Sequence, residues 1–348
     1  MFDNYIYQSG ISSSFQLHFE ELANYICNLG NDQGYVLEIG SNDGLLLNKL
    51  KQLGINCVGV EPSLQLVEVA HNQGLEAHHG FWNQDSKNQI VSKYGSPKII
   101  VANNVFAHIE DMRSTTALIS EVLDSDGYFV FEVSYFADVF ENNLFDTIYH
   151  EHMSYHTMTP LIKFFEDFEM KIINVDRISI HGGSIRVTVA KNLEISVDVS
   201  VKALVQLENQ MKLNDPDILN DLRIKIKNKK DEVWKLLQEI EENGFVFGFA
   251  APAKLVTFLS VMDMEKIHIV GIIDDNPLKQ GKFLPGSGIE IMSSVSMSGL
   301  LETKLEVIKY CFVFAWNIGE ELLGKLRNNF PKGLNVIQFV PDVSSVEL

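Results

Sequence analysis

A chain of 348 residues in which 46% are apolar is too long for one ordinary core and apolar enough to bury two. Its formal net charge of -18, from 28 basic and 46 acidic residues, argues against non-specific nucleic-acid binding, because phosphates would be repelled. The three cysteines are far apart in the sequence, so they can form neither a disulfide framework nor a four-cysteine zinc site.

The first part of the chain predicts a helix preceded by aromatic residues. Serines at positions 12 to 14 are typical helix caps, and apolar residues then recur with helical spacing, so we expect a helix packed on a sheet. Tyr5 and Tyr7 are candidates for the edge of a substrate site, with core or surface packing as the alternative. There is no basic leader and no apolar run as long as a membrane span, so we expect a cytoplasmic protein without a membrane contact.

Two apolar runs within residues 36–61 predict neighbouring strands of a nucleotide site. The first run ends in a turn-prone loop, GSNDG at residues 40–44, and the chain then continues as a helix. Gly40 and Gly44 allow a ligand to lie directly against the loop and the start of the helix. The spacing lacks the G-x-G-x-x-G of a dinucleotide fold. The second run ends in Glu61, about twenty residues after the loop, where ribose hydroxyls are usually held, so the pair predicts an adenosine site.

These two strands resemble the S-adenosylmethionine site of class I methyltransferases. In that family a Glu at the end of the first strand precedes the glycine loop, and an acid after the second strand binds the ribose. Glu38 and Glu61 are the matching residues here. The resemblance implies S-adenosylmethionine as the cofactor, with the loop residues Gly40, Asn42 and Gly44 facing its methionine part. Such a ligand needs no phosphate cradle with a basic residue.

The next elements continue the alternation of strands and helices that makes a mostly parallel sheet. Phe81 follows the third predicted strand, where an adenine ring could stack on it. A fourth, buried strand at residues 99–102 delivers Asn104 and His108 to its carboxyl end, where ligand-facing residues of open α/β sheets lie. We therefore add Phe81 and Asn104 to the predicted cofactor site.

Residues 149–152, with the sequence Tyr-His-Glu-His, concentrate groups that carry proton-transfer chemistry. His152 and His156 would lie one turn apart in a helix, but the H-E-x-x-H order of zinc helices is absent, so we predict acid–base chemistry and no metal. A histidine has an ordinary pKa near about 6.5 and can take up a proton at neutral pH, while a tyrosine can donate to an oxygen that develops charge. Glu151 could orient such a histidine, although a plain structural carboxylate is the alternative for Glu151 alone.

The rest of the chain predicts the end of the first domain, a helical connection and a second domain. His181 precedes a glycine-hinged strand that would complete the first sheet. A charged helical stretch broken at Pro216 predicts two helices, and apolar strands from residue 245 onward predict another sheet, with Lys254 at the start of a helix. The expected fold class is α/β: a Rossmann-like class I methyltransferase domain at 1–192, a helical connector at 193–243, and a smaller Rossmann-like α/β domain at 244–348.

Four ordered motifs resemble the sugar C-methyltransferases that build branched deoxysugars on thymidine diphosphate. They lie at residues 104–109 (NVFAHI), 149–155 (YHEHMSY), 248–254 (GFAAPAK) and 274–281 (DDNPLKQG). The likeness covers nearly the whole chain, from Tyr5 onward. It implies methyl transfer from S-adenosylmethionine to a sugar carbon beside a ketone. The small-molecule partner would be a 4-keto deoxysugar nucleotide, bound on the side of the C-terminal domain.

The residue roles follow from this resemblance and from its chemistry. A carbon beside a ketone becomes a nucleophile only after a base removes its proton and the enolate oxygen is stabilised. By resemblance, His152 is the leading base and Glu151 its partner. Tyr149 and His108 would line the reacting centre, and the two histidines could exchange roles. The residues predicted to contact the acceptor, with Lys254 beside its diphosphate, are Tyr5, Tyr7, His181 and Lys254.

This chain departs from the family pattern in three places. The family typically begins with a small cysteine-rich zinc domain, and the present chain begins where that domain would have ended, so we expect no zinc. Ala250 stands where a glycine is common, and Leu255 and Val256 replace a small polar pair, which could alter the acceptor pocket. No long apolar repeat is evident at the predicted surface, so we expect a monomer.

Three other functions compete with this one. An O- or N-methyltransferase acting on a sugar or another small metabolite would keep the methyl donor and need a weaker base. A nicotinamide-dependent oxidoreductase would use the second domain, but no G-x-G-x-x-G follows residues 245–247. A non-catalytic module that binds sugar nucleotides is disfavoured by the run of acid–base groups at residues 149–152.

Overall fold

The structure is a computed structural model that describes residues 13–30, 34–241, 245–264, 268–297, 299, 308–330 and 333–348. Contacts between residues divide the chain into two compact units. The first unit comprises Met1–Ala137 and Met153–Leu213, and the second comprises Asp138–His152 and Asn214–Leu348. The segment Asp138–His152 therefore groups with the C-terminal part of the chain, although it lies within the range predicted for the first domain.

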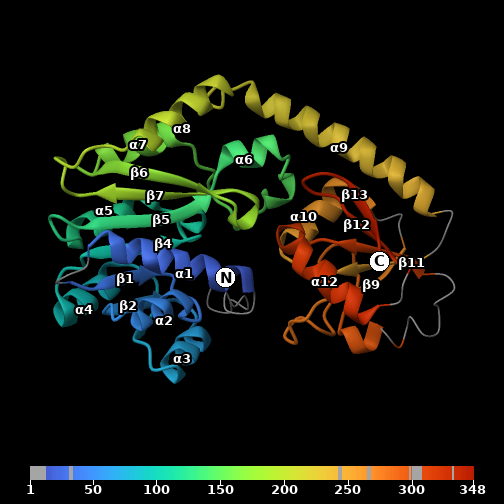
Figure 1. Cartoon of the computed structure of the whole chain (residues 1–348), viewed down its shortest axis with the longest axis horizontal. Helices are drawn as coiled ribbons and strands as arrows, with labels where there is room; N and C mark the ends of the chain where they lie inside the picture. Colours follow the sequence, from blue (N-terminus) through green and yellow to red (C-terminus); the bar gives the residue numbers. More distant parts are fainter. Residues whose placement is uncertain are drawn as a thin grey trace. The chain divides into compact units, whose positions relative to one another are not determined.

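The first unit is built on a seven-stranded sheet with the order β3-β2-β1-β4-β5-β7-β6 (Figure 1). Its strands are β1 (Val36–Ile39), β2 (Cys57–Glu61), β3 (Ala77–His79), β4 (Ile99–Asn103), β5 (Tyr128–Ser134), β6 (Lys171–Ile178) and β7 (Ser184–Ala190). Neighbours among β1 to β5 are parallel, whereas β7 runs antiparallel between β5 and β6. The strand order reverses between β1 and β4, so these strands border the switch point where open α/β sheets bind ligands.

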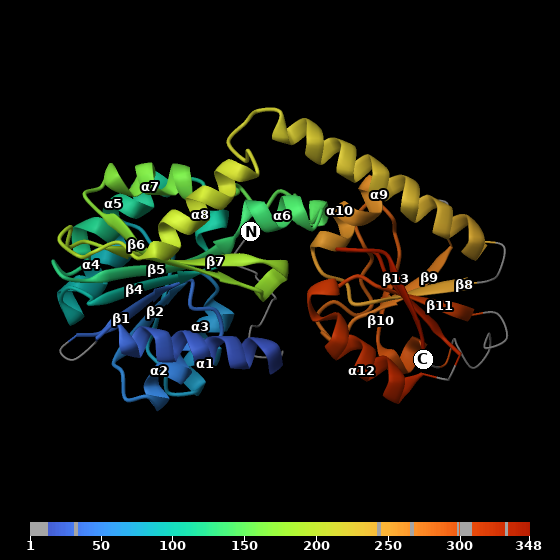
Figure 2. The same ribbon diagram turned by 45° about the horizontal axis from the view of Figure 1, so that its top comes forward.

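Helices cover both faces of this sheet, with α1 and α2 on one face and α5 and α7 on the other (Figure 2). The helices are α1 (Ser13–Asn28), α2 (Leu45–Gln52), α3 (Leu64–Asn72), α4 (Gln84–Tyr94), α5 (Met112–Val122), α6 (Phe136–Glu141), α7 (Met158–Glu166) and α8 (Val199–Gln210). Phe15, Leu22 and Ile26 of α1 pack against Val36 and Ile99 of the sheet, because helical spacing places them on one face. The prediction of an N-terminal helix on the sheet is confirmed.

A buried group of charges connects α1 to the middle of this sheet. Glu132 of β5 is fully buried. Nε of Arg186 on β7 donates to its Oε1 at 2.7 Å, and Nε2 of His18 on α1 lies 2.7 Å from its Oε2. Burial alone would raise the pKa of Glu132, but His18 and Arg186 hold it below the usual value. The carboxylate therefore links one helix and two strands.

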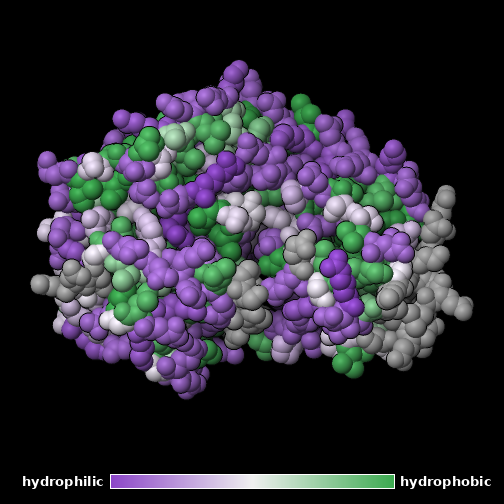
Figure 3. Space-filling view, viewed as in Figure 1, coloured by the Kyte–Doolittle hydropathy of each residue, from purple (hydrophilic) through white to green (hydrophobic). Residues whose placement is uncertain are grey.

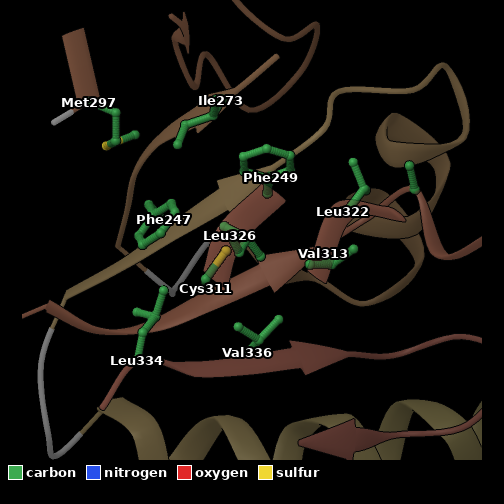
Figure 4. Packing of buried hydrophobic residues seen from close by; sticks show 11 residues of the cluster. Phe247, Phe249, Ile273, Met297, Cys311, Val313, Leu322, Leu326, Leu334 and Val336 are labelled. Carbon is green, nitrogen blue, oxygen red and sulfur yellow. The ribbon is translucent and has the colours of Figure 1, made fainter. Parts of the chain in front are cut away.

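The second unit contains a six-stranded sheet with the order β10-β9-β8-β11-β12-β13. Its elements are β8 (Phe245–Phe249), β9 (Ile269–Ile273), β10 (Ile291–Met292), β11 (Ile308–Val313), β12 (Asn335–Gln338), β13 (Ser344–Glu347), α9 (Ile218–Glu241), α10 (Lys254–Val261) and α12 (Gly319–Asn329). Only the pair β12 and β13 is antiparallel among the described strand pairs. Phe247, Cys311, Leu326 and Val336 belong to its core (Figure 4). The two sheets confirm the predicted fold class, a Rossmann-like unit followed by a smaller α/β unit.

The two helices predicted on either side of Pro216 are also present. They are α8 in the first unit and α9 in the second. No helix in the part of the chain that the structure describes combines the length and apolarity needed to cross a bilayer. The surface in Figure 3 is mainly hydrophilic, as expected from the net charge of -18.

Candidate active site

The loop between β1 and α2 is built around two glycines. Gly40 has a φ of 72° and Gly44 a φ of 81°, in the left-handed region that favours glycine. A Cβ at Gly40 would lie 2.5 Å from Cγ2 of Val105, and a Cβ at Gly44 would lie 2.7 Å from Cδ1 of Leu75. A side chain at either position would be strained by the positive φ, and its Cβ would displace the side chain of Val105 or Leu75.

Glu61, at the end of β2, ties the second strand to this loop. Its Oε2 accepts the N–H of Asn42 at 2.9 Å, and its Oε1 accepts the N–H of Ser63 at 2.9 Å. The side chain is buried, and burial raises the pKa of Glu61, while the hydrogen bonds from Ser63 and Asn42 oppose that rise. Because each carboxylate oxygen has a second acceptor site, Glu61 can bind further donors without releasing the loop.

Polar atoms without partners gather at the same edge of the sheet. Within the described residues, four side chains here contain a buried polar atom that has no hydrogen-bond partner: Glu38, Ser41, Ser63 and Asn103. They lie at or just after the ends of β1, β2 and β4, which are neighbouring strands. Burial raises the pKa of Glu38 well above its usual value, and the charges of Asp43 and Glu61 add to the rise. An unpaired buried polar atom costs about 1–3 kcal/mol, so this group indicates a polar ligand that supplies the partners.

The turn after β4 carries two of the predicted site residues. Asn104 has a positive φ of 52°, and His108 ends the short helix η3 (Phe106–His108). The carbonyl of Ala107 accepts the N–H of Met153 at 2.8 Å. This hydrogen bond places Met153, the first residue of the first unit after His152, beside η3.

Residues 145–152 form a turn that holds two predicted catalytic side chains together. It begins with the short helix η4 (Phe145–Thr147). The carbonyl of Thr147 lies 2.8 Å from Nδ1 of His152. Because a carbonyl can only accept, Nδ1 carries a proton, so in the neutral form of the ring the basic lone pair is on Nε2. The ring centroid of Tyr149 lies 4.3 Å from that of His152. The turn thus presents a histidine of defined tautomer beside a phenol.

The metal alternative weighed for His152 and His156 finds no geometric support. Residues 149–156 form no helix, so the two histidines are not on adjacent turns. His156 is buried, and burial lowers its pKa to about 4. In the described portion of the chain, no group of three or more His, Cys, Asp or Glu side chains is arranged to hold a metal ion.

Lys254, at the start of α10, is surrounded by groups of the second unit. Its Nζ donates to Oδ1 of Asn317 at 2.6 Å and lies 3.7 Å from the centroid of the Trp316 ring. The indole N–H of Trp316 donates to Oδ2 of Asp146 at 2.6 Å. Burial lowers the pKa of Lys254 to about 8, while the charge of Asp146 opposes the shift. Lys254 is therefore connected to the segment that carries the predicted base.

Comparisons with known proteins decide the family. Residues 16–175 match the family model of a methyltransferase domain, and residues 179–341 match that of a C-methyltransferase C-terminal domain. The C-methyltransferase NovU of Streptomyces niveus is 28% identical over 347 residues, which cover 98% of this chain and 81% of NovU. The chain belongs to the C-methyltransferases. As a C-methyltransferase it is an enzyme that uses S-adenosylmethionine, which confirms the sequence-based prediction of family, enzyme class and cofactor.

Solved methyltransferase structures align with about half of this C-methyltransferase. Magnesium protoporphyrin IX methyltransferase of Synechocystis PCC 6803, with bound SAH, is 12% identical with a TM-score of 0.41, covering 51% of this chain and 83% of that chain. A methyltransferase of Thermotoga maritima, described as a possible histamine N-methyltransferase, is 16% identical with a TM-score of 0.38, covering 51% and 89%. The family assignment depends on the sequence matches.

The residues at the switch point of the C-methyltransferase fit S-adenosylmethionine. The ligand carries positive charge and ribose hydroxyl donors, and the carboxylates of Glu38 and Glu61 offer acceptors for both. The amide of Asn103 offers an acceptor and a donor that have no partner in the described structure. The glycine loop lies beside these groups, with Gly40 packed against Val105 and Gly44 against Leu75.

The remaining predicted residues of the C-methyltransferase site are more dispersed. Phe81 is half-exposed after β3. His181 lies in the short helix η5 (Ile180–Gly182) with a φ of 56°, and its ring centroid is 5.0 Å from that of Phe15. Tyr5 and Tyr7 lie outside the described residues. Their contacts with a ligand, and the orienting role of Glu151, stay predictions.

Sequence reasoning missed two residues of the site. Asn103 ends β4, and the strand-end rule that favoured Asn104 applies equally to it. Asp146 precedes the Tyr149 motif in the sequence, but its partner Trp316 is 170 residues away. A strand-end rule could have identified Asn103, whereas no local pattern indicates the Asp146 pair.

Proposed function

We propose that this C-methyltransferase moves the methyl group of S-adenosylmethionine to the carbon beside the ketone of a 4-keto deoxysugar nucleotide. The observation that supports this most is the turn at residues 147–152, with His152 in a defined tautomer and Tyr149 beside it. An oxygen or nitrogen acceptor is already nucleophilic, whereas a carbon acceptor needs a base that removes a proton. A neutral histidine with its basic nitrogen at Nε2 meets that need.

The proposed reaction begins with enolisation of the acceptor. Nε2 of His152 takes the proton from the carbon, and the bond from Nδ1 to the Thr147 carbonyl stabilises the imidazolium that forms. The hydroxyl of Tyr149 donates to the oxygen that becomes the enolate. His108 is the alternative base. S-adenosylmethionine supplies an electrophilic methyl group when bound, and Glu61 would hold its ribose while Glu38 faces its amino-acid part.

Solvent deuterium tests this proposal directly. The protein is incubated in D2O with a panel of 4-keto deoxysugar nucleotides and no methyl donor, and exchange at the carbon beside the ketone is followed by NMR. We expect exchange without the donor and a carbon-methylated product once labelled S-adenosylmethionine is added. Methyl transfer without exchange would mean that the acceptor atom is oxygen or nitrogen. It would contradict the proposal.

Glu61 gives a prediction for the cofactor site. Glu61→Ala should weaken S-adenosylmethionine binding by about 1.5–3 kcal/mol for each charge-assisted hydrogen bond lost, or roughly tenfold to a hundredfold. Glu61→Gln keeps the volume and one acceptor oxygen, so it should lose less. Isothermal calorimetry measures both. Glu76→Ala is the control, because Glu76 is an exposed carboxylate of the same unit and should leave the affinity unchanged. Wild-type affinity in a folded Glu61→Ala variant would remove Glu61 from the cofactor site.

A further inference from the structure

Several contacts attach the segment Asp138–His152 to the rest of the second unit. Near its start, Nζ of Lys225 on α9 donates to the carbonyl of Phe140 at 2.8 Å. Farther along, the ring of Phe145 stacks on that of Phe258 on α10, with centroids 5.9 Å apart and planes at 25°. These contacts fix the segment before it reaches the turn that carries His152.

Asp146 forms a further attachment, and it is a charged one. Its carboxyl is buried, and Oδ2 accepts the indole N–H of Trp316 at 2.6 Å. Oδ1 has no partner within the described residues, and Asp146 lines a small cavity with room for about one water molecule. Burial raises the pKa of Asp146, and the charge of Lys254 opposes that rise. The backbone of Asp146 and Thr147 and the side chain of Trp316 donate hydrogen bonds to this carboxylate. A buried carboxylate is costly to keep, so packing alone does not explain it.

The position of Asp146 in the chain connects this attachment to the base. The next residue is Thr147, whose carbonyl lies 2.8 Å from Nδ1 of His152. The same carbonyl also accepts the N–H of Tyr149 at 3.1 Å. Fixing Asp146 therefore fixes the peptide group that sets the tautomer and direction of the imidazole. Trp316 links Lys254 to Asp146, because Nζ of Lys254 lies over its ring while its indole N–H donates to the Asp146 carboxylate.

We propose that Asp146, Trp316 and Lys254 are positioning residues for His152, so that the C-terminal unit contributes to the chemical step. The inference depends on the proposed function, in which His152 is the base. It gives the C-terminal unit a role in turnover besides any contact with the nucleotide of the acceptor. It also gives Lys254 a role that differs from the predicted diphosphate contact, since positioning acts on kcat and diphosphate binding acts on KM.

Two variants test the positioning role. Trp316→Phe removes the indole N–H and keeps an aromatic ring beside Lys254, and Asp146→Asn keeps the size of the side chain and removes its charge. A misplacement of about 1 Å at a reacting centre can cost about 10²-fold in rate, so we expect kcat and deuterium wash-in to fall by at least about tenfold. Affinity for S-adenosylmethionine and the acceptor KM should stay near the wild-type values. The double variant should lose less than the product of the single losses, because both changes break one link.

The imidazole ¹⁵N NMR signal of His152, assigned by its absence in His152→Asn, gives a readout without any acceptor. We expect the Nδ1–H tautomer in the wild type and a shift toward Nε2–H in both variants. Lys325→Met is the control, because Lys325 is an exposed lysine of the same unit that pairs with Asp275 at 2.8 Å and should change nothing.

Unchanged tautomer and turnover in both folded variants would overturn the positioning role. A raised acceptor KM with unchanged kcat would also overturn it, and would agree with the predicted diphosphate contact of Lys254. A wild-type enzyme that exchanges no acceptor proton would contradict the proposed function instead. In that case, the tautomer shift in the variants would still support the positioning of His152.

Discussion

The expected result of His152→Asn is a fall of about 10²–10⁴-fold in deuterium wash-in at the acceptor carbon, the usual cost of losing a positioned general base. Asparagine fills similar space, and its side-chain amide can still donate to the Thr147 carbonyl, so the turn should persist. The amide cannot accept the proton at neutral pH. NMR without the methyl donor measures the exchange, and transfer of labelled methyl should fall by the same order because enolisation comes first.

The control for this prediction is His150→Asn. His150 lies in the same turn but is exposed, so its loss should leave wash-in nearly unchanged. Tyr149→Phe adds a second comparison, because it removes the hydroxyl proposed to donate to the enolate and keeps the ring beside His152. Undiminished wash-in in His152→Asn would move the base role to His108 or Tyr149.

Local sequence patterns were sufficient to predict most of the first sheet. Each of β1, β2 and β4 is an apolar run followed by a loop and a helix, and such a pattern reports burial directly. The position of β7 was not predictable in this way. It inserts between β5 and β6, where Arg186 meets Glu132 across 54 residues of sequence. Periodicity shows that a strand is buried, but it does not identify its neighbours.

The same distinction between predictable and unpredictable contacts holds for the candidate site. Glu61 and Asn42 are 19 residues apart, within one strand–helix–strand unit, so their association follows from a motif. The partner of Nδ1 in His152 is a backbone carbonyl, which has no side-chain signature, so the sequence could not indicate it. Trp316 is remote from Asp146 in the sequence. Contacts of this kind become visible only once the fold is known.

The second unit contains an acid with hydrogen bonds similar to those of Glu61. Comparing the two acids shows which features of the first unit indicate a ligand. Asp274, after β9, accepts the N–H of Ala251 and the N–H of Asn276, each at 2.9 Å, as Glu61 does with Asn42 and Ser63. In both units, therefore, an acid at the end of one strand accepts the backbone N–H of a residue in the loop after the neighbouring strand. This arrangement belongs to the fold and does not by itself indicate a ligand. Lys279 pairs with Asp274 at 3.1 Å, so a lysine balances that charge. The buried atoms of Glu38 and Asn103 that have no partner among the described residues, more than the bracing by Glu61, make the first unit the candidate cofactor site.

Glu132 gives the largest expected effect on stability. Glu132→Gln should lower the free energy of unfolding of the first unit by about 3–5 kcal/mol at pH 7, because it leaves the buried Arg186 without its counter-charge. Hydrogen exchange of peptides from β5 and β7 measures this unit separately from the second. Asp167→Asn is the control. Asp167 pairs with Arg113 at 2.9 Å, and the two side chains are 47% and 63% exposed, so its loss should cost at most about 1 kcal/mol.

The pH dependence of this difference follows from the lowered pKa of Glu132. A carboxyl whose pKa is lower in the folded state contributes its full stability above the pKa of the unfolded chain, and the contribution is lost as pH falls through the folded pKa. The advantage of the wild type over Glu132→Gln should therefore persist from pH 7 to pH 5 and shrink below the ordinary glutamate value of 4.5. His156, whose pKa burial lowers to about 4, is present in both proteins and cancels in the difference. A difference at pH 7 no larger than that of Asp167→Asn would mean that the buried charges stabilise the sheet no more than an exposed ion pair does.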